Sequence, residues 1–146
     1  MPLSFASEQS IWLIDDHPPL HHLVRAALED LNFAGDLVSI YTLSEAEKQF
    51  RETMMDTRLP HLVLLDINLK GQDGLVFLKK MKGQYGSFPF PVVIFSSSDR
   101  MEEMVLAYEM GAQSYVVKPF HFDMMVQYLE GMIAFFLGQD YTQPAV

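Results

Sequence analysis

The sequence predicts an α/β protein: a (βα)5 domain whose doubly wound parallel sheet of five strands is covered by helices on both faces. Two observations lead to this class. Short apolar runs alternate along the chain with longer segments in which apolar residues recur every three or four positions, the pattern of successive strand and helix units. Several runs are continuously apolar and rich in β-branched residues, as expected for strands buried on both faces.

The apolar runs themselves are the five expected strands. They cover residues 11–14, 37–41, 62–65, 92–95 and 115–117. Each is far shorter than the roughly 20 residues that a membrane-spanning helix needs. The N-terminus also lacks a basic flank followed by an apolar signal core. We therefore expect a soluble, cytoplasmic protein with no membrane partner.

Helical periodicity fills the first two intervals between these runs. Six apolar residues between Leu20 and Leu31 fall at offsets 0, 3, 4, 7, 8 and 11, which places them on one helical face. In the second interval, Ser44 and Glu47 have the spacing of a capping box, in which the two side chains satisfy backbone donors at a helix start. The sequence thus predicts two helices, the first facing the core.

Three further helices are expected. The third follows a turn at Gly71 and Gly74 and ends near residues 83–86. The fourth lies between Asp99 and Met110, with Gly111 as a left-handed C-cap. The last runs from about residue 122 to 137, and besides its core stripe it carries Met124, Tyr128 and Phe135. Because these three lie off the stripe, we expect exposed apolar area there, and a homodimer or effector contact through this helix.

Size and charge limit the class of protein further. A chain of 146 residues suits one domain, which we assign to residues 8–137, with 138–146 as a C-terminal tail or the start of a linker. The absence of cysteine excludes disulfides and thiolate chemistry. The formal charge of −9 would repel a phosphate backbone, so we expect no direct nucleic-acid binding by this domain.

Polar residues with chemical capacity follow four of the five expected strands. In chain order they are Asp15 and Asp16, Asp66, Ser96 and Ser97, and Lys118. Because ligands bind beyond the carboxyl ends of parallel strands, we expect these groups to converge. Clustered carboxylates repel one another unless a proton or a cation intervenes, and their oxygens favour Mg²⁺. Asp66 would then be a carboxylate nucleophile, with Lys118 and Ser96 contacting phosphoryl oxygens.

The motifs WLIDDH, LVLLDINLKGQDG, PVVIFSSSD and GAQSYVVKPF resemble those of response-regulator receiver domains of two-component signalling. The resemblance covers residues 10–137 and implies a flavodoxin-like receiver fold. It also implies a phosphoacceptor signalling domain rather than an enzyme, which takes a phosphoryl group on Asp66 from a histidine kinase or a phosphotransfer protein. Such a domain catalyses only its own phosphotransfer and autodephosphorylation.

The resemblance also implies a role for each site residue. Asp16, Asp66 and the backbone carbonyl of Asn68 would bind Mg²⁺ directly, and Asp15 would bind it through water. Lys118 would pair with Asp66 before phosphorylation.

Two further roles concern the switch. Ser96 would move toward the phosphoryl group, and Tyr115 would then turn inward. The peptide bond between Lys118 and Pro119 would be cis. Lys70 stands where the family often has proline.

The sequence also allows three other interpretations. Asp66 begins a D-x-N rather than the D-x-D motif of aspartate-nucleophile phosphatases, so the acid that would protonate a leaving group is missing. A receiver that acts only as a binding module, without phosphorylation, is a further alternative. A metal site on His17, His21 and His22 is disfavoured, because the prolines at 18 and 19 place His17 in a turn and we expect His21 and His22 on the surface.

Overall fold

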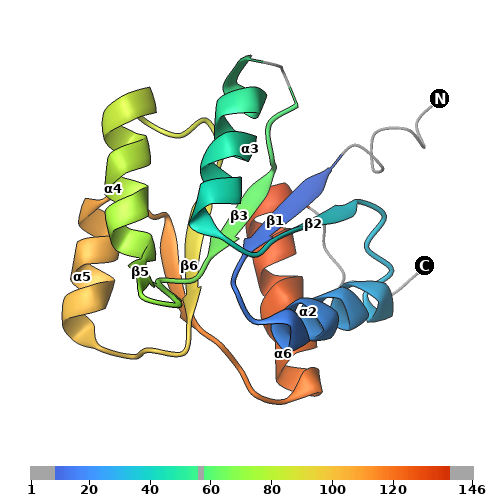
Figure 1. Cartoon of the computed structure of the whole chain (residues 1–146). Coiled ribbons are helices and arrows are strands. Elements are labelled where there is room, and N and C mark those ends of the chain that lie inside the picture. Colours follow the sequence, from blue (N-terminus) through green and yellow to red (C-terminus); the bar gives the residue numbers. More distant parts are fainter. Residues whose placement is uncertain (1–8, 56–57, 139–146) are drawn as a thin grey trace.

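Five strands form one parallel sheet in the order β2-β1-β3-β6-β7 (Figure 1). Their bounds are Ser10–Ile14 (β1), Asp36–Ile40 (β2), Leu62–Leu65 (β3), Val92–Ser96 (β6) and Ser114–Val117 (β7). The computed structural model describes residues 9–55 and 58–138. All five expected strands are present with ends within one residue of prediction, so the (βα)5 class is confirmed. The predicted tail lies, from residue 139 onward, outside the described residues.

Helices cover both faces of the sheet. One face carries α2 (Pro18–Asp30) and α6 (Phe122–Met132), and the other carries α3 (Leu43–Met55), α4 (Gly74–Tyr85) and α5 (Met101–Glu109). The helix α6 continues into one π-helical segment, η1 (Ile133–Leu137). After β2 the chain crosses back over β1 to form β3, so the direction of winding reverses between β1 and β3. In doubly wound sheets such a switch point is where ligands bind.

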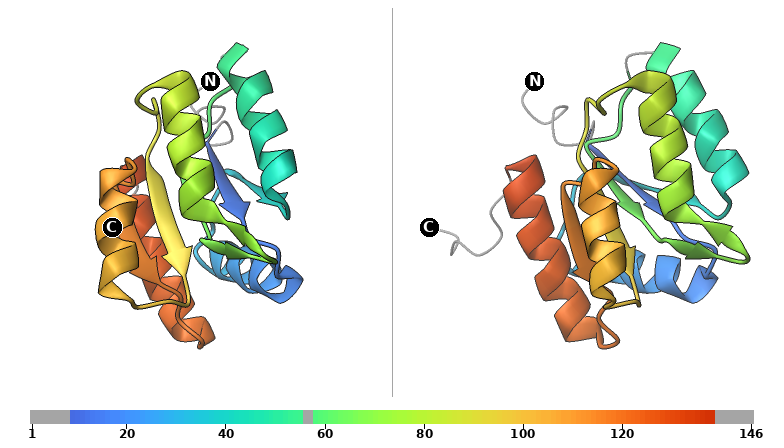
Figure 2. Two further views of the ribbon diagram at one scale, coloured as in Figure 1. Left: turned by 60° about the vertical axis from the view of Figure 1, so that its left-hand side comes forward. Right: turned by 90° about the vertical axis from the view of Figure 1, so that its left-hand side faces the viewer.

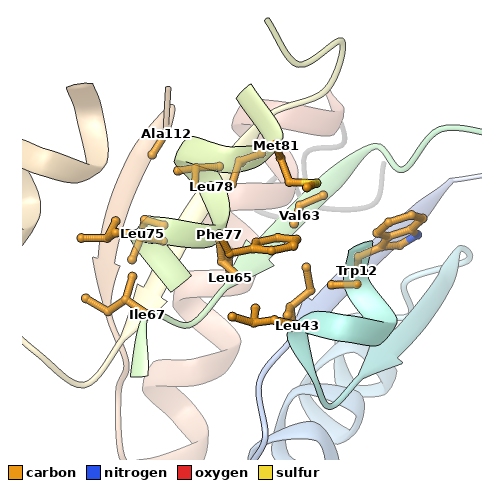
Figure 3. Packing of buried hydrophobic residues seen from close by; sticks show 14 of the residues in the cluster. Trp12, Leu43, Val63, Leu65, Ile67, Leu75, Phe77, Leu78, Met81 and Ala112 are labelled. Atoms are coloured by element: carbon orange, nitrogen blue, oxygen red, sulfur yellow. The ribbon is translucent and has the colours of Figure 1, made fainter. Parts of the chain in front are cut away.

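Two apolar cores follow from the alternation of side chains along each strand. On β1, Trp12 and Ile14 pack with α3 and α4, whereas Ile11 and Leu13 pack with α2 and α6. Figure 3 shows the first core, in which the Phe77 ring lies near the centre of the cluster between α4 and the sheet. Phe50 of α3 anchors it, with its ring centroid 5.2 Å from that of Trp12. The fully buried strands explain the unbroken apolar runs.

The turn expected after β3 contains a short hairpin that the sequence did not predict. Its strands are β4 (Asn68–Leu69) and β5 (Gln72–Asp73), paired antiparallel. The two loop residues between them, Lys70 and Gly71, both have positive φ, at 33° and 78°. A two-residue hairpin loop of type I′ requires this sign at both positions, and proline cannot adopt it. Lys70 therefore suits a loop geometry that excludes proline.

Helix α3 begins two residues earlier than its predicted capping box indicates, with Thr42 rather than Ser44 at the N-cap. The carbonyl of Thr42 accepts the first helical hydrogen bond, from Ala46 N at 3.0 Å, and its Oγ1 accepts one from Glu45 N at 3.1 Å. The prediction that Ser44 caps this helix was wrong, because Thr42 already supplies the acceptor at the N-cap position. Glu47 instead lies 3.0 Å from the Nζ of Lys80 on α4.

The outer surfaces of α5 and α6 are unusually apolar. In α5 only Ala107 is buried, and the stripe that the sequence indicated is largely exposed, including Met101, Val105 and Tyr108. On the last helix, Met124, Tyr128 and Phe135 are exposed as expected, Phe135 at 81%. Gly111 follows α5 with φ 102°, as predicted for its left-handed cap. In the described part of the chain, no helix is both long and apolar enough to cross a membrane.

Candidate functional site

The strand ends bring three carboxylates together at the switch point. The Asp15 N–H donates to the carbonyl of Ile40 at 3.0 Å, and the Asp66 N–H donates to that of Ile14 at 2.9 Å, so both residues continue the hydrogen bonding of the sheet. One oxygen from each of Asp15, Asp16 and Asp66 can be chosen so that all three lie within 4.8 Å of one another. Asp15 and Asp66 are buried and Asp16 is half-buried.

Lys118 joins this cluster from the end of β7. Its Nζ lies 2.6 Å from Asp15 Oδ2 and 3.2 Å from Asp66 Oδ2, and its side chain is only 14% exposed. The main chain holds the residue in place, because the Lys118 N–H donates to the carbonyl of Ser96 at 2.8 Å. The expected pairing of Lys118 with Asp66 is therefore present, and the pairing with Asp15 is shorter.

The electrostatic state of Asp66 is unusual. Burial raises the pKa of its carboxyl above the ordinary value, and the adjacent Asp15 carboxylate adds to the rise. The Lys118 ammonium and the Asn68 N–H, which donates to Asp66 Oδ1 at 3.2 Å, act in the opposite direction. The site thus holds excess negative charge in a poorly solvated place, a condition that favours a bound cation.

The three carboxylates differ in how they are held. Both oxygens of Asp15 accept hydrogen bonds, Oδ1 from His17 N at 2.8 Å and Oδ2 from Lys118. Both oxygens of Asp66 also accept, although at 3.2 Å each. Among the described residues, the carboxylate of Asp16 contacts no donor. Asp16 therefore has the most freely available oxygens for an added cation.

A hydrogen-bonded chain leads away from the end of β6. The fully buried Ser96 Oγ accepts from Ser98 N at 3.1 Å, and the Ser98 carbonyl accepts from the Tyr115 hydroxyl at 2.8 Å. The Ser98 hydroxyl in turn donates to the Glu103 carboxylate on α5. Tyr115 is half-buried against the first apolar core. Ser96 is thus connected to both Tyr115 and α5 through Ser98, a role that the sequence gave no means of assigning.

The backbone packs closely behind Asp66. The Gly74 N–H donates to the carbonyl of Ile67 at 2.9 Å, and Asp73 caps α4 by accepting from Leu75 N at 2.8 Å. A Cβ at position 74 would collide with the backbone carbonyl of Asp66. The predicted turn glycine is therefore required by close approach to the loop that carries Asp66.

Two expectations about the site were wrong. Within the described residues no peptide bond is cis, and that between Lys118 and Pro119 is trans, the isomer that a prolyl bond prefers intrinsically. His21 was expected on the surface but is 98% buried, with 2% exposure, because its ring fits beneath Tyr41 while His22 takes the outward position. The exposure of His22 agrees with prediction.

A separate cavity of about 1200 Å³ lies at the opposite end of the sheet. It is lined at the amino ends of the strands by residues such as Ser10, Asp36 and Pro91. Its lining includes Asp36, Glu52 and Arg58, but in the described part of the chain only Asp15, Asp16 and Asp66 form a group of three side chains that could hold a metal ion. The cluster of carboxylates and the Lys118 ammonium at the carboxyl ends of the strands is therefore the candidate functional site.

Comparison with known proteins agrees with this geometry. Residues 11–130 match the family model described as "Response regulator receiver domain". The chain is 28% identical over 134 residues to the DNA-binding transcriptional regulator NtrC of Escherichia coli K12, an alignment that covers 92% of this chain and 26% of NtrC. It is 33% identical over 109 residues to the nitrate/nitrite response regulator NarL of the same organism, covering 75% of this chain and 47% of NarL.

Solved structures share the fold. The phosphorylated cyanobacterial phytochrome response regulator RcpA superposes with a TM-score of 0.77 at 25% identity, covering 88% of this chain and 94% of that one. The receiver domain of NtrX from Brucella abortus gives 0.64 at 30% identity, covering 83% and 95%. The chain spans between about a quarter and a half of the lengths of NtrC and NarL.

Proposed function

Because the chain belongs to the response regulator receiver domain family, we propose that Asp66 is its phosphoacceptor and that phosphorylation there alters the surface formed by α5, β7 and α6. The observation that carries the proposal is the position of Lys118 Nζ, within 3.2 Å of both Asp15 and Asp66. Four strand ends thus supply the Asp66 nucleophile, the Lys118 ammonium to contact the phosphoryl oxygens, the Ser96 hydroxyl and two further carboxylates. The crystal structure of a phosphorylated relative, RcpA, supports the same reaction.

The reaction is phosphoryl transfer from a phosphohistidine on a histidine kinase or a phosphotransfer protein. An Asp66 carboxylate oxygen attacks phosphorus, the phosphorus–nitrogen bond of the donor breaks, and the imidazole leaves with the bonding electron pair. The product is an acyl phosphate on Asp66, which water later hydrolyses to phosphate and the free carboxyl. Positioning and charge neutralisation supply most of the acceleration in such a transfer.

The acidic cluster suits Mg²⁺. We assign Asp16, Asp66 and the Asn68 carbonyl as direct ligands and Asp15 as a ligand through water, because the buried oxygens of Asp15 are already engaged by His17 and Lys118. Mg²⁺ supplies neutralisation of the charge on the incoming phosphoryl group. The raised pKa of the buried Asp66 supports a site that gains from a cation.

The chain's own groups complete the site. Lys118 exchanges its contact with Asp66 for a phosphoryl oxygen, since an ammonium is a compact point charge. The Ser96 hydroxyl donates a hydrogen bond to another phosphoryl oxygen. Its movement displaces Ser98, whose backbone N–H donates a hydrogen bond to Ser96 Oγ. Ser98 also forms hydrogen bonds with Tyr115 on β7 and Glu103 on α5, so the movement is transmitted to both elements. Tyr115 and Ser96 are accordingly the switch residues.

The proposed activity is that of a signalling domain, limited to its own phosphotransfer and autodephosphorylation. Asn68 occupies the position where an aspartate-nucleophile phosphatase needs a second acid, and its exposed side chain cannot protonate a leaving group. We assign residues 8–137 to this domain, 138–146 to a tail or linker, and its site of action to the cytoplasm. The negative formal charge again argues against direct nucleic-acid binding.

Phosphorylation of the purified chain tests the proposal. With Mg²⁺ and a small phosphodonor such as acetyl phosphate, mass spectrometry should find one added phosphoryl group that hydroxylamine removes. Asp66→Asn should take none, whereas Asp99→Asn, which alters an exposed acid near the same edge, should behave as the native chain. An unmodified native chain, or equal modification of Asp66→Asn, would contradict the assignment.

A further part of the proposal concerns the partner surface. The exposed apolar side chains of α6 and η1 include Met124, Tyr128 and Phe135. Tyr128 and Phe135 line a groove of about 420 Å³ against Gln113 and Ser114. Figure 2 shows α5 and α6 flanking β7 at this edge of the sheet. We propose that this surface, which we term the α6 surface, binds a second copy of the chain or an effector after phosphorylation.

A further inference from the structure

We propose that His21 is a positioning residue for the reaction at Asp66: its imidazole N–H holds the peptide unit that joins Asp15 to Asp16 and thereby aims the Asp16 carboxylate at the cation. The inference rests on the proposed function. It concerns a residue that none of the matched motifs assigns to the site. The evidence is one short hydrogen bond, the burial of the ring and the lack of any other group that orients Asp16.

The hydrogen bond fixes the state of the ring. His21 Nε2 lies 2.7 Å from the backbone carbonyl oxygen of Asp15. A carbonyl oxygen can only accept, so Nε2 must carry the hydrogen. Among the described residues, the buried Nδ1 has no partner. The neutral ring with its hydrogen on Nε2 is therefore the form that the surroundings accommodate.

The ring is enclosed rather than resting on the surface. His21 is 2% exposed, and the ring of Tyr41, at the end of β2, covers it with a centroid separation of 4.2 Å. Burial lowers the pKa of the His21 imidazole below its ordinary value, because a charged ring would be poorly solvated there. A buried, covered donor has few alternatives to the bond that it makes, so the carbonyl that it contacts is held firmly.

That carbonyl belongs to the junction of the two acids. Peptide units are planar, so fixing the oxygen of Asp15 also fixes the direction of the bond to Asp16 and the point from which its side chain leaves the backbone. The Asp15 carboxylate is independently held by Lys118 and His17. Asp16 has no such partner among the described residues. Its direction depends on its backbone, which His21 restrains.

Amide substitutions at position 21 can separate this role from packing. The amide nitrogen of Gln lies about as far from the backbone as Nε2 of His, whereas that of Asn is one methylene shorter. We therefore expect His21→Gln to keep the donor and His21→Asn to lose it. His21→Phe preserves the ring and removes the donor. His22→Phe changes the exposed neighbour on the same helix and serves as the matched control.

The first measurement is Mg²⁺ affinity by calorimetry on the unphosphorylated chain, with folding checked by circular dichroism. Because groups that orient metal ligands contribute strongly to affinity, His21→Phe and His21→Asn should weaken binding roughly tenfold. His21→Gln should stay within about twofold of the native chain, and His22→Phe should match it. Folded His21→Phe or His21→Asn with native affinity would overturn the proposal, and so would failure of Gln to restore it.

A second measurement needs no variant to fold. Nitrogen-15 NMR of the native chain should find a hydrogen on Nε2 of His21. A ring without a hydrogen on Nε2 would overturn the proposal whatever the variants do. Failure of the native chain to take a phosphoryl group would instead contradict the proposed function. That result would leave the Mg²⁺ affinities of the four variants to decide the role of His21.

Discussion

Asp66, the proposed phosphoacceptor, lowers the stability of the fold at neutral pH. It is buried beside Asp15, and its pKa is raised chiefly by burial and less by that neighbour. The native state therefore retains the Asp66 proton to higher pH than the unfolded chain, whose ordinary pKa is 3.8. Stability contributed by the protonated form is present below that value and lost as the pH rises through the pKa of the folded state.

Neutralising Asp66 should consequently stabilise the protein. In the presence of a chelator at pH 7, we expect Asp66→Asn to raise the free energy of unfolding by on the order of 1 kcal/mol. The gain should shrink as the pH falls toward 3.8, where the native carboxyl is itself neutral. Urea unfolding at several pH values measures both effects.

The control for this prediction is Asp36→Asn, because Asp36 is exposed at the start of β2. That change should leave stability nearly unaltered. The explanation would be refuted by an Asp66→Asn protein that is no more stable than the native chain at pH 7. A gain that grows on acidification would refute it equally.

Residue by residue, the sequence indicated the groups of the site but not their contacts. Asp15, Asp16, Asp66, Ser96 and Lys118 could be named because each follows an apolar run, and strand ends share one edge of a parallel sheet. The burial of His21 on α2 could not be foreseen, since it depends on Tyr41, which directly follows β2. The connection of Ser98 to Glu103 likewise depends on how α5 is placed.

At the level of elements, strands were predicted better than helix starts. A fully buried strand, such as β3 or β6, needs an unbroken apolar run, whose ends are visible in the sequence. The start of α3 was not visible in this way, because Thr42 and Ser44 both offer a hydroxyl. The hairpin of β4 and β5 was missed because its strands have two residues each, too few to produce an alternating pattern.

The start of α3 gives a test of this distinction. Thr42→Ala should destabilise the protein by about 1 kcal/mol, because the hydrogen bond to Glu45 N is lost at the N-cap. Thermal or urea unfolding measures the change. Ser44→Ala, two residues further into the chain and inside the helix, should have a clearly smaller effect. If Ser44→Ala lowered the free energy of unfolding more than Thr42→Ala does, Ser44 would be the N-cap, as the sequence first indicated.

At the scale of the whole molecule, the proposed α6 surface predicts association. With beryllofluoride and Mg²⁺ as a phosphoryl mimic, sedimentation velocity should detect dimers of the purified chain. Phe135→Ser should weaken dimerisation by roughly tenfold or more, because the most exposed aromatic side chain of that surface is removed. Association should be weaker without the mimic.

Val76→Ser is the matched control, since Val76 is exposed at 63% on α4, away from the α6 surface. Its dimerisation should equal that of the native chain. A native chain that stays monomeric with the mimic would exclude a second copy as the occupant and leave an effector protein as the partner.

The contact of Lys118 with Asp15 spans 103 positions of sequence, and this separation has a consequence for synthesis. A nascent chain that has not yet exposed its fifth strand possesses the acids but lacks their ammonium partner, and the sheet edge that would align them is unfinished. A kinase would therefore meet no working acceptor on an incomplete or misfolded chain. In a cell, only completely synthesised and folded molecules would be able to accept a phosphoryl group. A defect in folding would therefore reduce phosphorylation and would not produce phosphorylated, misfolded chains.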